Sequence, residues 1–345
     1  RFFGDVPLIL DLKTVEDSKG PRDSKELIYD QIIEDLTFAE EHLPLRSEYS
    51  ASDEGRINKG AAKILFGKVY LTKGDFQKAK DKLAEVVEHE SEYGFGLHKD
   101  YHANWLRDTE AGIEAVLYIE YKEPPFQHNG EMALAGPKYS IPGSLGISAL
   151  NEADIPTQEL YDQFDNRDLR KKTNFKTEFA HLKTGEILKS SIPLSGKFWV
   201  EGLETGDRCD VNMHIIRYAD AILMYAEALN EVGESTKALA MLNRIRERAF
   251  GDDSGNFKPM SKDEFRTAIL NERRLEFPHE GHRWFDLVRT GTFIQRMKEH
   301  SAYEAKVAEA NKTEIAQNIK EHMILMPIPQ SEIDLNPNLV QNAGY

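Results

Sequence analysis

The sequence GKVYLTKGDFQKAKDKL, residues 67–83, decides the fold, because the stretch AEALNEVGESTKALAML, residues 226–242, repeats its spacing without a gap. Small and large apolar residues alternate at intervals of 3, 9 and 4 positions in both stretches, at Gly67, Tyr70, Ala79 and Leu83 in the first and at Ala226, Leu229, Ala238 and Leu242 in the second. A glycine, Gly74 or Gly233, lies at the same place in each stretch, where a helix can end in the left-handed conformation. Each stretch is therefore predicted to form two antiparallel helices joined by a short turn.

This spacing is the tetratricopeptide (TPR) pattern, in which small residues occupy the places where two helices cross closely. Helical periodicity continues outside the two hairpins. Apolar residues recur at three- and four-residue steps over residues 28–43, and a capping box of Ser261 and Glu264 begins a further helix. We therefore predict a mainly α protein, in which TPR-like helical hairpins form an α-α superhelix.

A long segment of different character separates the two hairpins. Residues 98–213 are rich in Gly, Pro, Asn, Asp and aromatic residues, and they keep little helical phase; short strands are predicted near 115–121 and 197–200. Binding residues often concentrate in such loop-rich inserts on a rigid frame. We expect one compact domain, with a helical portion at 1–97, a loop-rich insert with the ligand-binding face at 98–213, and TPR-like pairs with a C-terminal segment at 214–345.

Composition excludes several classes of function. The formal charge is −15, from 59 acidic and 44 basic residues, which disfavours nucleic acid as a partner. The single cysteine, Cys209, excludes internal disulfides and multi-cysteine metal clusters. No run of apolar residues approaches the ~20 needed to span a bilayer.

Motifs that could carry catalysis or bind a metal are weak. His279 and His282 are three residues apart after Pro278, whereas the zinc-protease pattern places its histidines four apart on a continuous helix. Phosphate loops, nucleophile elbows and Cys-His signatures are missing from the sequence. We therefore predict no catalytic residues, no metal site and no cofactor.

Two further motifs have structural interpretations. The stretch Asp252–Asn256 resembles a calcium loop superficially, but it lacks the alternating ligand spacing; a solvated turn is favoured, and a structural calcium ion is the open alternative. Charged residues three apart are predicted to pair along helix faces. These pairs are Arg273 with Glu276, Arg283 with Asp286, and Asp286 with Arg289.

Sugar binding requires aromatic rings that pack against pyranose faces, together with amides, guanidiniums or hydroxyls that bind the ring hydroxyls. The insert contains such residues. The candidates for ligand contacts are Tyr101, Trp105, Phe126, Asn129, Tyr139, Trp199 and Arg208. Each also has a structural alternative; Trp105, for example, precedes Leu106 and would fit a core position.

Several short stretches of the sequence are distinctive. They are RFFGDVPL at 1–8, IRYAD at 216–220, YAEALN at 225–230, NERRLEF at 271–277 with EGHRWFDLVRTG at 280–291, MPIP at 326–329 and LNPN at 335–338. These stretches resemble those of a known family, the SusD/RagB-like nutrient-binding proteins. The resemblance covers essentially the whole chain.

The resemblance implies a surface-exposed lipoprotein of the outer membrane of Gram-negative bacteria. Such a protein binds an oligosaccharide or polysaccharide without catalysis and delivers it to a TonB-dependent, SusC-like transporter. Family members usually begin with a signal peptide, a lipid-bearing cysteine and the first TPR helices, so we expect this chain to be truncated at the amino end and to lack that lipid anchor. The alternatives are a peptide-binding RagB-type protein or TPR scaffold and, less favoured, a glycoside hydrolase.

Overall fold

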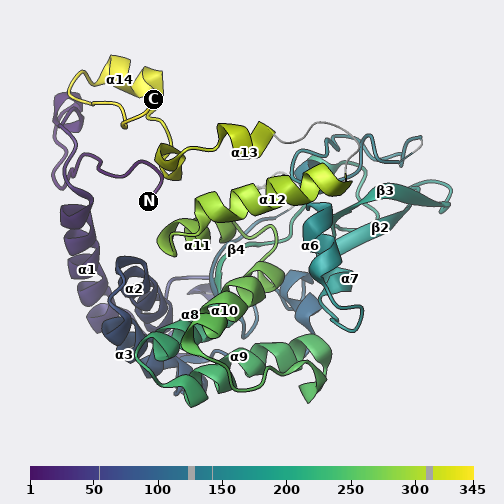
Figure 1. The fold of residues 1–345 in the computed structure, drawn as a ribbon, viewed down its shortest axis with the longest axis horizontal. Coiled ribbons are helices and arrows are strands. Elements are labelled where there is room, and N and C mark those ends of the chain that lie inside the picture. Colours follow the sequence, from purple (N-terminus) through teal and green to yellow (C-terminus); the bar gives the residue numbers. More distant parts are fainter. Residues whose placement is uncertain (54, 123–128, 142, 308–313) are drawn as a thin grey trace. The chain divides into compact units, whose positions relative to one another are not determined.

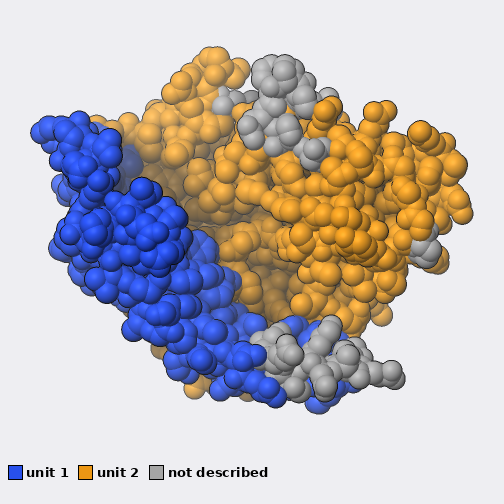
Figure 2. All heavy atoms as spheres, turned by 90° about the horizontal axis from the view of Figure 1, so that it is seen from above, with its two compact units in different colours: residues 1–39, 284–345 blue, residues 40–283 orange. Residues whose placement is uncertain are grey.

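The computed structural model describes residues 1–345 except 54, 123–128, 142 and 308–313 (Figure 1). Contacts divide the chain into two compact units, one formed by Arg1–Ala39 with Trp284–Tyr345 and the other by Glu40–Arg283 (Figure 2). We call them unit 1 and unit 2. The expected segment 98–213 lies wholly within unit 2, whereas 1–97 and 214–345 are each divided between the two units. The assignment of ligand binding to residues 98–213 stays a prediction.

Unit 2 contains both predicted hairpins. Its main helices are α2 (Lys59–Lys73), α3 (Phe76–Val87), α8 (Tyr218–Glu231), α9 (Ser235–Phe250) and α10 (Lys262–Glu276), with the short helices α4 (Glu90–Tyr93), α5 (Glu131–Ala135), α6 (Gln158–Gln163) and α7 (Lys171–Asn174). Gly74 ends α2 with φ 78°, and Gly233 follows α8 with φ 88°. The predicted mainly α, TPR-like architecture is confirmed, including the capping box at Ser261.

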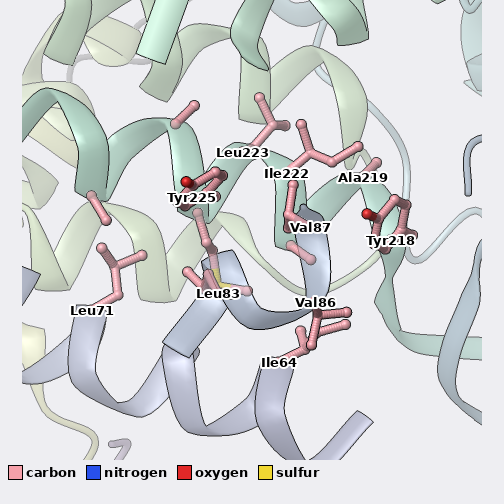
Figure 3. Close-up of a cluster of buried hydrophobic side chains, with 14 of the residues drawn as sticks. Ile64, Leu71, Leu83, Val86, Val87, Tyr218, Ala219, Ile222, Leu223 and Tyr225 are labelled. Carbon is pink, nitrogen blue, oxygen red and sulfur yellow. The ribbon is translucent and has the colours of Figure 1, made fainter. Parts of the chain in front are cut away.

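The hairpins pack because their small residues allow close contact. A Cβ atom on Gly67 would lie 2.4 Å from Leu83 Cγ, so the α2–α3 crossing requires glycine at this position. The α2–α3 hairpin lies against α8, the first helix of the second hairpin, and the buried cluster there includes Ile64, Leu83 and Ile222, each completely buried (Figure 3). This core is the rigid frame on which the rest of unit 2 is built.

Two small antiparallel sheets lie in the segment between the hairpins. Strand β1 (Ala115–Ile119) pairs with β4 (Met213–Arg217), and β2 (Phe175–Ala180) pairs with β3 (Ile187–Ser195). The strand predicted near 115–121 is therefore confirmed, whereas the one predicted at 197–200 is wrong. Those residues form a turn in which the Trp199 amide donates to the Gly196 carbonyl, and Lys197 points into the protein.

Unit 1 joins the two ends of the chain. Its helices are the first part of α1 (Lys25–His42), most of α11 (Arg283–Arg289), α12 (Phe293–Val307), α13 (Glu314–Asn318) and α14 (Gln330–Leu335). The Arg22 guanidinium donates to the carbonyls of Phe3, Asp5 and Val340 and to the Asn342 side chain at 2.7–3.0 Å. Across the described part of the chain, every helix is too short or too polar to cross a membrane.

Of the three predicted charge pairs, one is confirmed, one is wrong, and the pair of Arg283 with Asp286 stays a prediction. Arg289 pairs with Asp286 at 2.8 Å, as expected. Arg273 does not pair with Glu276; its guanidinium binds Asp220 at 2.7 Å, while Glu276 binds arginines from other elements. Long-range partners in a buried site have outweighed the local three-residue spacing.

Candidate functional site

A buried ionic cluster fixes the insert to the helical frame. At its centre, Arg217, at the end of β4, contacts Glu114 at 2.5 Å, Glu276 at 2.9 Å and Glu280 at 2.7 Å. All four side chains are almost completely buried. The planar guanidinium suits this role because it presents several donors in fixed directions.

The rest of the ionic cluster brings in distant segments. From the insert, Arg170 contacts Asp168, Glu272 and Glu276 at 2.7–2.9 Å, and Lys197 contacts Glu280 at 2.5 Å. Arg248 and Arg246 on α9 add contacts to Glu276 and Glu272. The cluster thus balances five cations against five carboxylates: Arg170, Lys197, Arg217, Arg246 and Arg248 against Glu114, Asp168, Glu272, Glu276 and Glu280.

Burial and pairing set the protonation of this cluster. Burial would raise the pKa of Glu280, but the charges of Arg217 and Lys197 outweigh it and lower that pKa to about 2. Burial lowers the pKa of Lys197 to about 8, although Glu280 opposes the shift. The Glu280 carboxylate is therefore ionised at neutral pH and already bound within the protein.

Two aromatic candidates support the cluster from inside. Tyr101 is 3% exposed, and its hydroxyl donates to the Glu276 carbonyl at 2.6 Å. Trp105 is 4% exposed, with the Lys197 ammonium 4.6 Å from its ring centroid. The sequence-based interpretation of these two rings as ligand contacts needs correction, because neither face is available at the surface.

Asn129 is also internal. Its side-chain amide donates to the Val211 carbonyl at 2.9 Å, and its side-chain oxygen accepts from the Glu131 amide at 2.7 Å. The residue is 2% exposed and joins two loops of the insert. Asn129 supports the loops beneath the surface and is not itself exposed, so its interpretation as a ligand contact is corrected as well. Another candidate, Phe126, lies outside the described residues.

Three candidates remain at the surface of the insert. Tyr139 is 75% exposed, Arg208 is exposed, and Trp199 is partly exposed with its ring packed edge to face on Phe179 at 4.7 Å. We call these three residues the insert surface. Their use by a ligand stays a prediction.

Backbone contacts link the segments that carry these three residues. The bridges between Asn129 and Cys209 and between Ser148 and Thr205 place the loops that contain Tyr139 and Arg208 side by side. The Ser191 amide of β3 donates to the Ser140 carbonyl at 2.9 Å. Trp199 packs beside Phe179 on the adjoining β2–β3 sheet. The insert surface therefore belongs to one connected part of unit 2.

A polar cavity was missed by the sequence reasoning. It has a volume of about 200 Å³ in unit 2, and the residues around it include Arg46, Tyr49, Arg56, Asn58 and Tyr118. Here strand β1 meets the loop that precedes α2. The alternation of side chains along β1 was a sequence signal for Tyr118, but the approach of the loop depends on contacts between distant segments.

An apolar groove lies within unit 1. It measures about 600 Å³, and half of the residues around it are aliphatic or proline, among them Pro7, Val15, Ile328, Pro329 and Leu335. The others are Phe3 and six polar or charged residues, Asp5, Ser18, Lys19, Arg22, Glu332 and Asn336. Phe3 is the one aromatic residue among those around the groove, whereas two tyrosines, Tyr49 and Tyr118, lie around the polar cavity of unit 2. The groove therefore offers fewer rings for stacking on a sugar.

The motifs considered for metal binding or catalysis are engaged in other contacts. His279 pairs with Asp154 at 3.1 Å, and His282 packs against Phe277 with a ring distance of 4.7 Å. Burial lowers the pKa of His282 to about 4. Among the described residues, no group of three His, Cys, Asp or Glu side chains is arranged to hold a metal ion.

Glu110 has an unusual protonation equilibrium. Burial raises its pKa from 4.5 to about 7, although a hydrogen bond from the Asn212 amide at 2.9 Å opposes the shift. A carboxyl with a raised folded-state pKa contributes stability that is full below its unfolded pKa and is lost as pH rises through about 7. Replacing the Glu110 carboxyl by a group that does not titrate should therefore change how the free energy of unfolding depends on pH.

We expect the free energy of unfolding of Glu110→Gln, measured relative to the wild type, to be larger at pH 8 than at pH 5. The gain should be on the order of 1 kcal/mol, allowing for solvent screening of a carboxyl near the surface. Urea unfolding at both pH values measures it, with Glu178→Gln as a control at an exposed glutamate. Parallel pH profiles for Glu110→Gln and the wild type would contradict the expectation.

Together, stacked TPR-like hairpins and a loop-rich insert with exposed aromatic residues define a helical binding protein. Comparisons with known proteins agree with this class. A profile described as the SusD family matches residues 196–345. "SusD-like protein P2" of Formosa agariphila is 30% identical over an alignment of 384 positions, gaps included, which covers 100% of this chain and 70% of that protein. The chain belongs to the SusD family, and the resemblance found in the sequence is confirmed.

Solved structures agree in fold. A SusD superfamily protein from Parabacteroides distasonis has a TM-score of 0.80 and 27% identity, and the match covers 100% of this chain and 75% of that one. A laminarin-binding SusD-like protein has a TM-score of 0.75 and 26% identity, with the same coverage of 100% and 75%. The helical architecture is thus shared over the full length of this chain.

Proposed function

We propose that this protein binds an oligosaccharide on its insert surface, leaves it uncleaved and delivers it to a TonB-dependent transporter at the outer membrane. The observation that carries the proposal is the exposure of Tyr139, with 75% of its surface open, in an insert fixed to a rigid frame. Support also comes from the family, since one solved relative is a laminarin-binding SusD-like protein.

The chemistry of the insert surface suits a sugar. An exposed aromatic ring can stack on the apolar face of a pyranose, and it loses little side-chain entropy on binding. The Arg208 guanidinium can donate to ring hydroxyls. Trp199 is held by Phe179 while part of its surface is open, so it adds a second ring.

Absence of catalysis is part of the proposal. A glycosidase needs two carboxyl groups across a cleft, one of them with a raised pKa. Glu114 and Glu276 lie inside the ionic cluster, where arginines hold their pKa values below the usual range against the effect of burial. Glu110 and Glu131 have raised pKa values, mainly through burial. Asp210, the acidic group that adds to the shift of Glu110, pairs with Arg107 at 2.6 Å, and Asp154, which adds to that of Glu131, contacts His279 at 3.1 Å.

Alanine substitution of the two rings tests the proposal. We expect Tyr139→Ala and Trp199→Ala each to weaken binding by about 1 to 3 kcal/mol, because each removes an aromatic contact. Isothermal titration calorimetry with laminarin and starch oligosaccharides measures the effect. Phe38→Ala is a matched control, since this ring is 65% exposed but lies outside the insert. Tyr118→Ala tests whether the sugar uses the polar cavity.

Three results would count against the proposal. Unchanged affinity in both ring variants would exclude them as contacts. Release of reducing ends from the oligosaccharide, abolished by one carboxylate substitution, would identify a hydrolase. Binding of a peptide in place of sugar would favour the RagB-type or TPR-scaffold alternative.

Delivery and location can be tested in cells. We propose that the protein is a surface lipoprotein associated with a SusC-like transporter. Affinity purification from detergent-solubilised outer membranes should recover that transporter in stoichiometric amounts. Recovery of the protein in the soluble fraction without a transporter would contradict this part of the proposal.

A further inference from the structure

The Glu152 carboxylate gathers four hydrogen bonds on one oxygen. The backbone amides of Lys138, Tyr139 and Ser140 donate to its Oε1 at 2.7, 2.9 and 2.8 Å, and the Ser140 hydroxyl donates at 2.6 Å. Three consecutive amides thus point at one anionic group. The backbone on both sides of the exposed Tyr139 ring is held by this single side chain.

The segment that carries Glu152 is strained and well supported. Ala149 and Glu152 adopt positive φ values of 61° and 52°, which residues with a Cβ rarely accept. Backbone amides of Asn151, Glu152 and Ala153 donate to carbonyls in and just after α5 at 2.8–3.1 Å. Such strain persists only where surrounding contacts determine the conformation.

A third strained residue supports the same segment. His279 is the other described non-glycine residue with positive φ, at 60°, and its ring binds Asp154 at 3.1 Å. The conformation around residues 149–154 is therefore fixed from two sides, by α5 and by the loop after α10. Glu152 is a rigid support for the turn at 138–140.

The negative charge of Glu152 is needed for this contact. Burial would raise its pKa, but the Ser140 hydroxyl and the three amides outweigh burial and lower it. The carboxylate is therefore ionised at neutral pH and accepts all four bonds. Glutamine in its place would keep one acceptor oxygen but would lose the charge that strengthens each bond.

We propose that Glu152 is a positioning residue for sugar binding: it orders the turn at 138–140 and so presents the Tyr139 ring before a ligand arrives. This inference rests on the proposed function, in which Tyr139 contacts the sugar. Ordering a contact residue in advance reduces the entropy lost on association. The ring itself makes the contact, and Glu152 acts through it.

The test combines hydrogen exchange with binding. In Glu152→Gln and Glu152→Ala, we expect amide exchange at residues 138–140 to accelerate at least about tenfold without ligand, because the acceptor is weakened or removed. Affinity for the oligosaccharide bound by the wild type should fall about 3- to 20-fold, as the turn must then be ordered on binding. Glu178→Gln, which removes a charge elsewhere in the insert, should change neither quantity.

A double substitution separates positioning from other effects. In the Tyr139→Ala background, Glu152→Gln should cause no further loss of affinity, since there is no ring left to position. An equal loss in both backgrounds, or unchanged exchange at 138–140 in Glu152→Ala, would overturn the inference while the proposed function stands. Wild-type affinity in Tyr139→Ala would instead remove Tyr139 from the proposed site, and the role of Glu152 with it.

Discussion

Arg217→Ala is expected to lower the free energy of unfolding by about 3 to 5 kcal/mol, the cost typical of removing one partner from a buried ion pair. The side chain is completely buried and neutralises Glu114, Glu276 and Glu280. Without it, the buried carboxylates exceed the cations around them. Urea unfolding followed by circular dichroism measures the loss.

Two variants separate this effect from simple loss of an arginine. Arg266→Ala removes an arginine whose side chain is 51% exposed and pairs with Glu231, so the expected loss is below about 1 kcal/mol. Arg217→Lys keeps the charge but not the forked geometry, and its stability should lie between the wild type and Arg217→Ala. A loss for Arg217→Ala no larger than that for Arg266→Ala would show that the ionic cluster does not hold the insert.

The fold could be predicted because its determinants are local. Gly74 and Gly233 end their helices within the repeated stretches, and the small residues at the helix crossings lie only a few turns from their partners. Spacing along the sequence therefore reflects contacts in the structure. The ionic cluster could not be predicted in the same way, because Arg170, Arg217 and Glu276 are far apart in the sequence.

The candidate site could be predicted only in part, since residue type does not determine the direction of a side chain. Tyr101 and Trp105 have the right chemistry, but a short helical turn at Tyr101–Trp105 points both rings inward, and Leu106 is the more exposed neighbour at 43%. Tyr139 lies in a loop with Gly136, Pro137 and Gly143, a composition typical of surface loops, and its ring is exposed. The part played by Glu152 depends on a backbone conformation that the sequence does not reveal.

Leu83→Ala is expected to destabilise the protein by about 2 to 5 kcal/mol, because it leaves a cavity at the crossing of α2 and α3. Leu83 belongs to the cluster of buried side chains in Figure 3 and is completely buried. It lies directly against Gly67. The same change at Leu106, which is 43% exposed, should cost less than about 1 kcal/mol. Thermal and urea unfolding of both variants compare the two sites.

The contact between the two helices predicts a specific coupling. Gly67→Ala alone should destabilise by about 1 to 3 kcal/mol, since its methyl group would lie 2.4 Å from Leu83 Cγ and 2.7 Å from Cδ2. In the Leu83→Ala background the same methyl group has room, and alanine is the better helix former by about 1 kcal/mol. Gly67→Ala should therefore become neutral or stabilising there, with a coupling energy of about 1 to 3 kcal/mol. Additive losses in the double variant would mean that the close crossing of α2 and α3 does not depend on glycine at position 67.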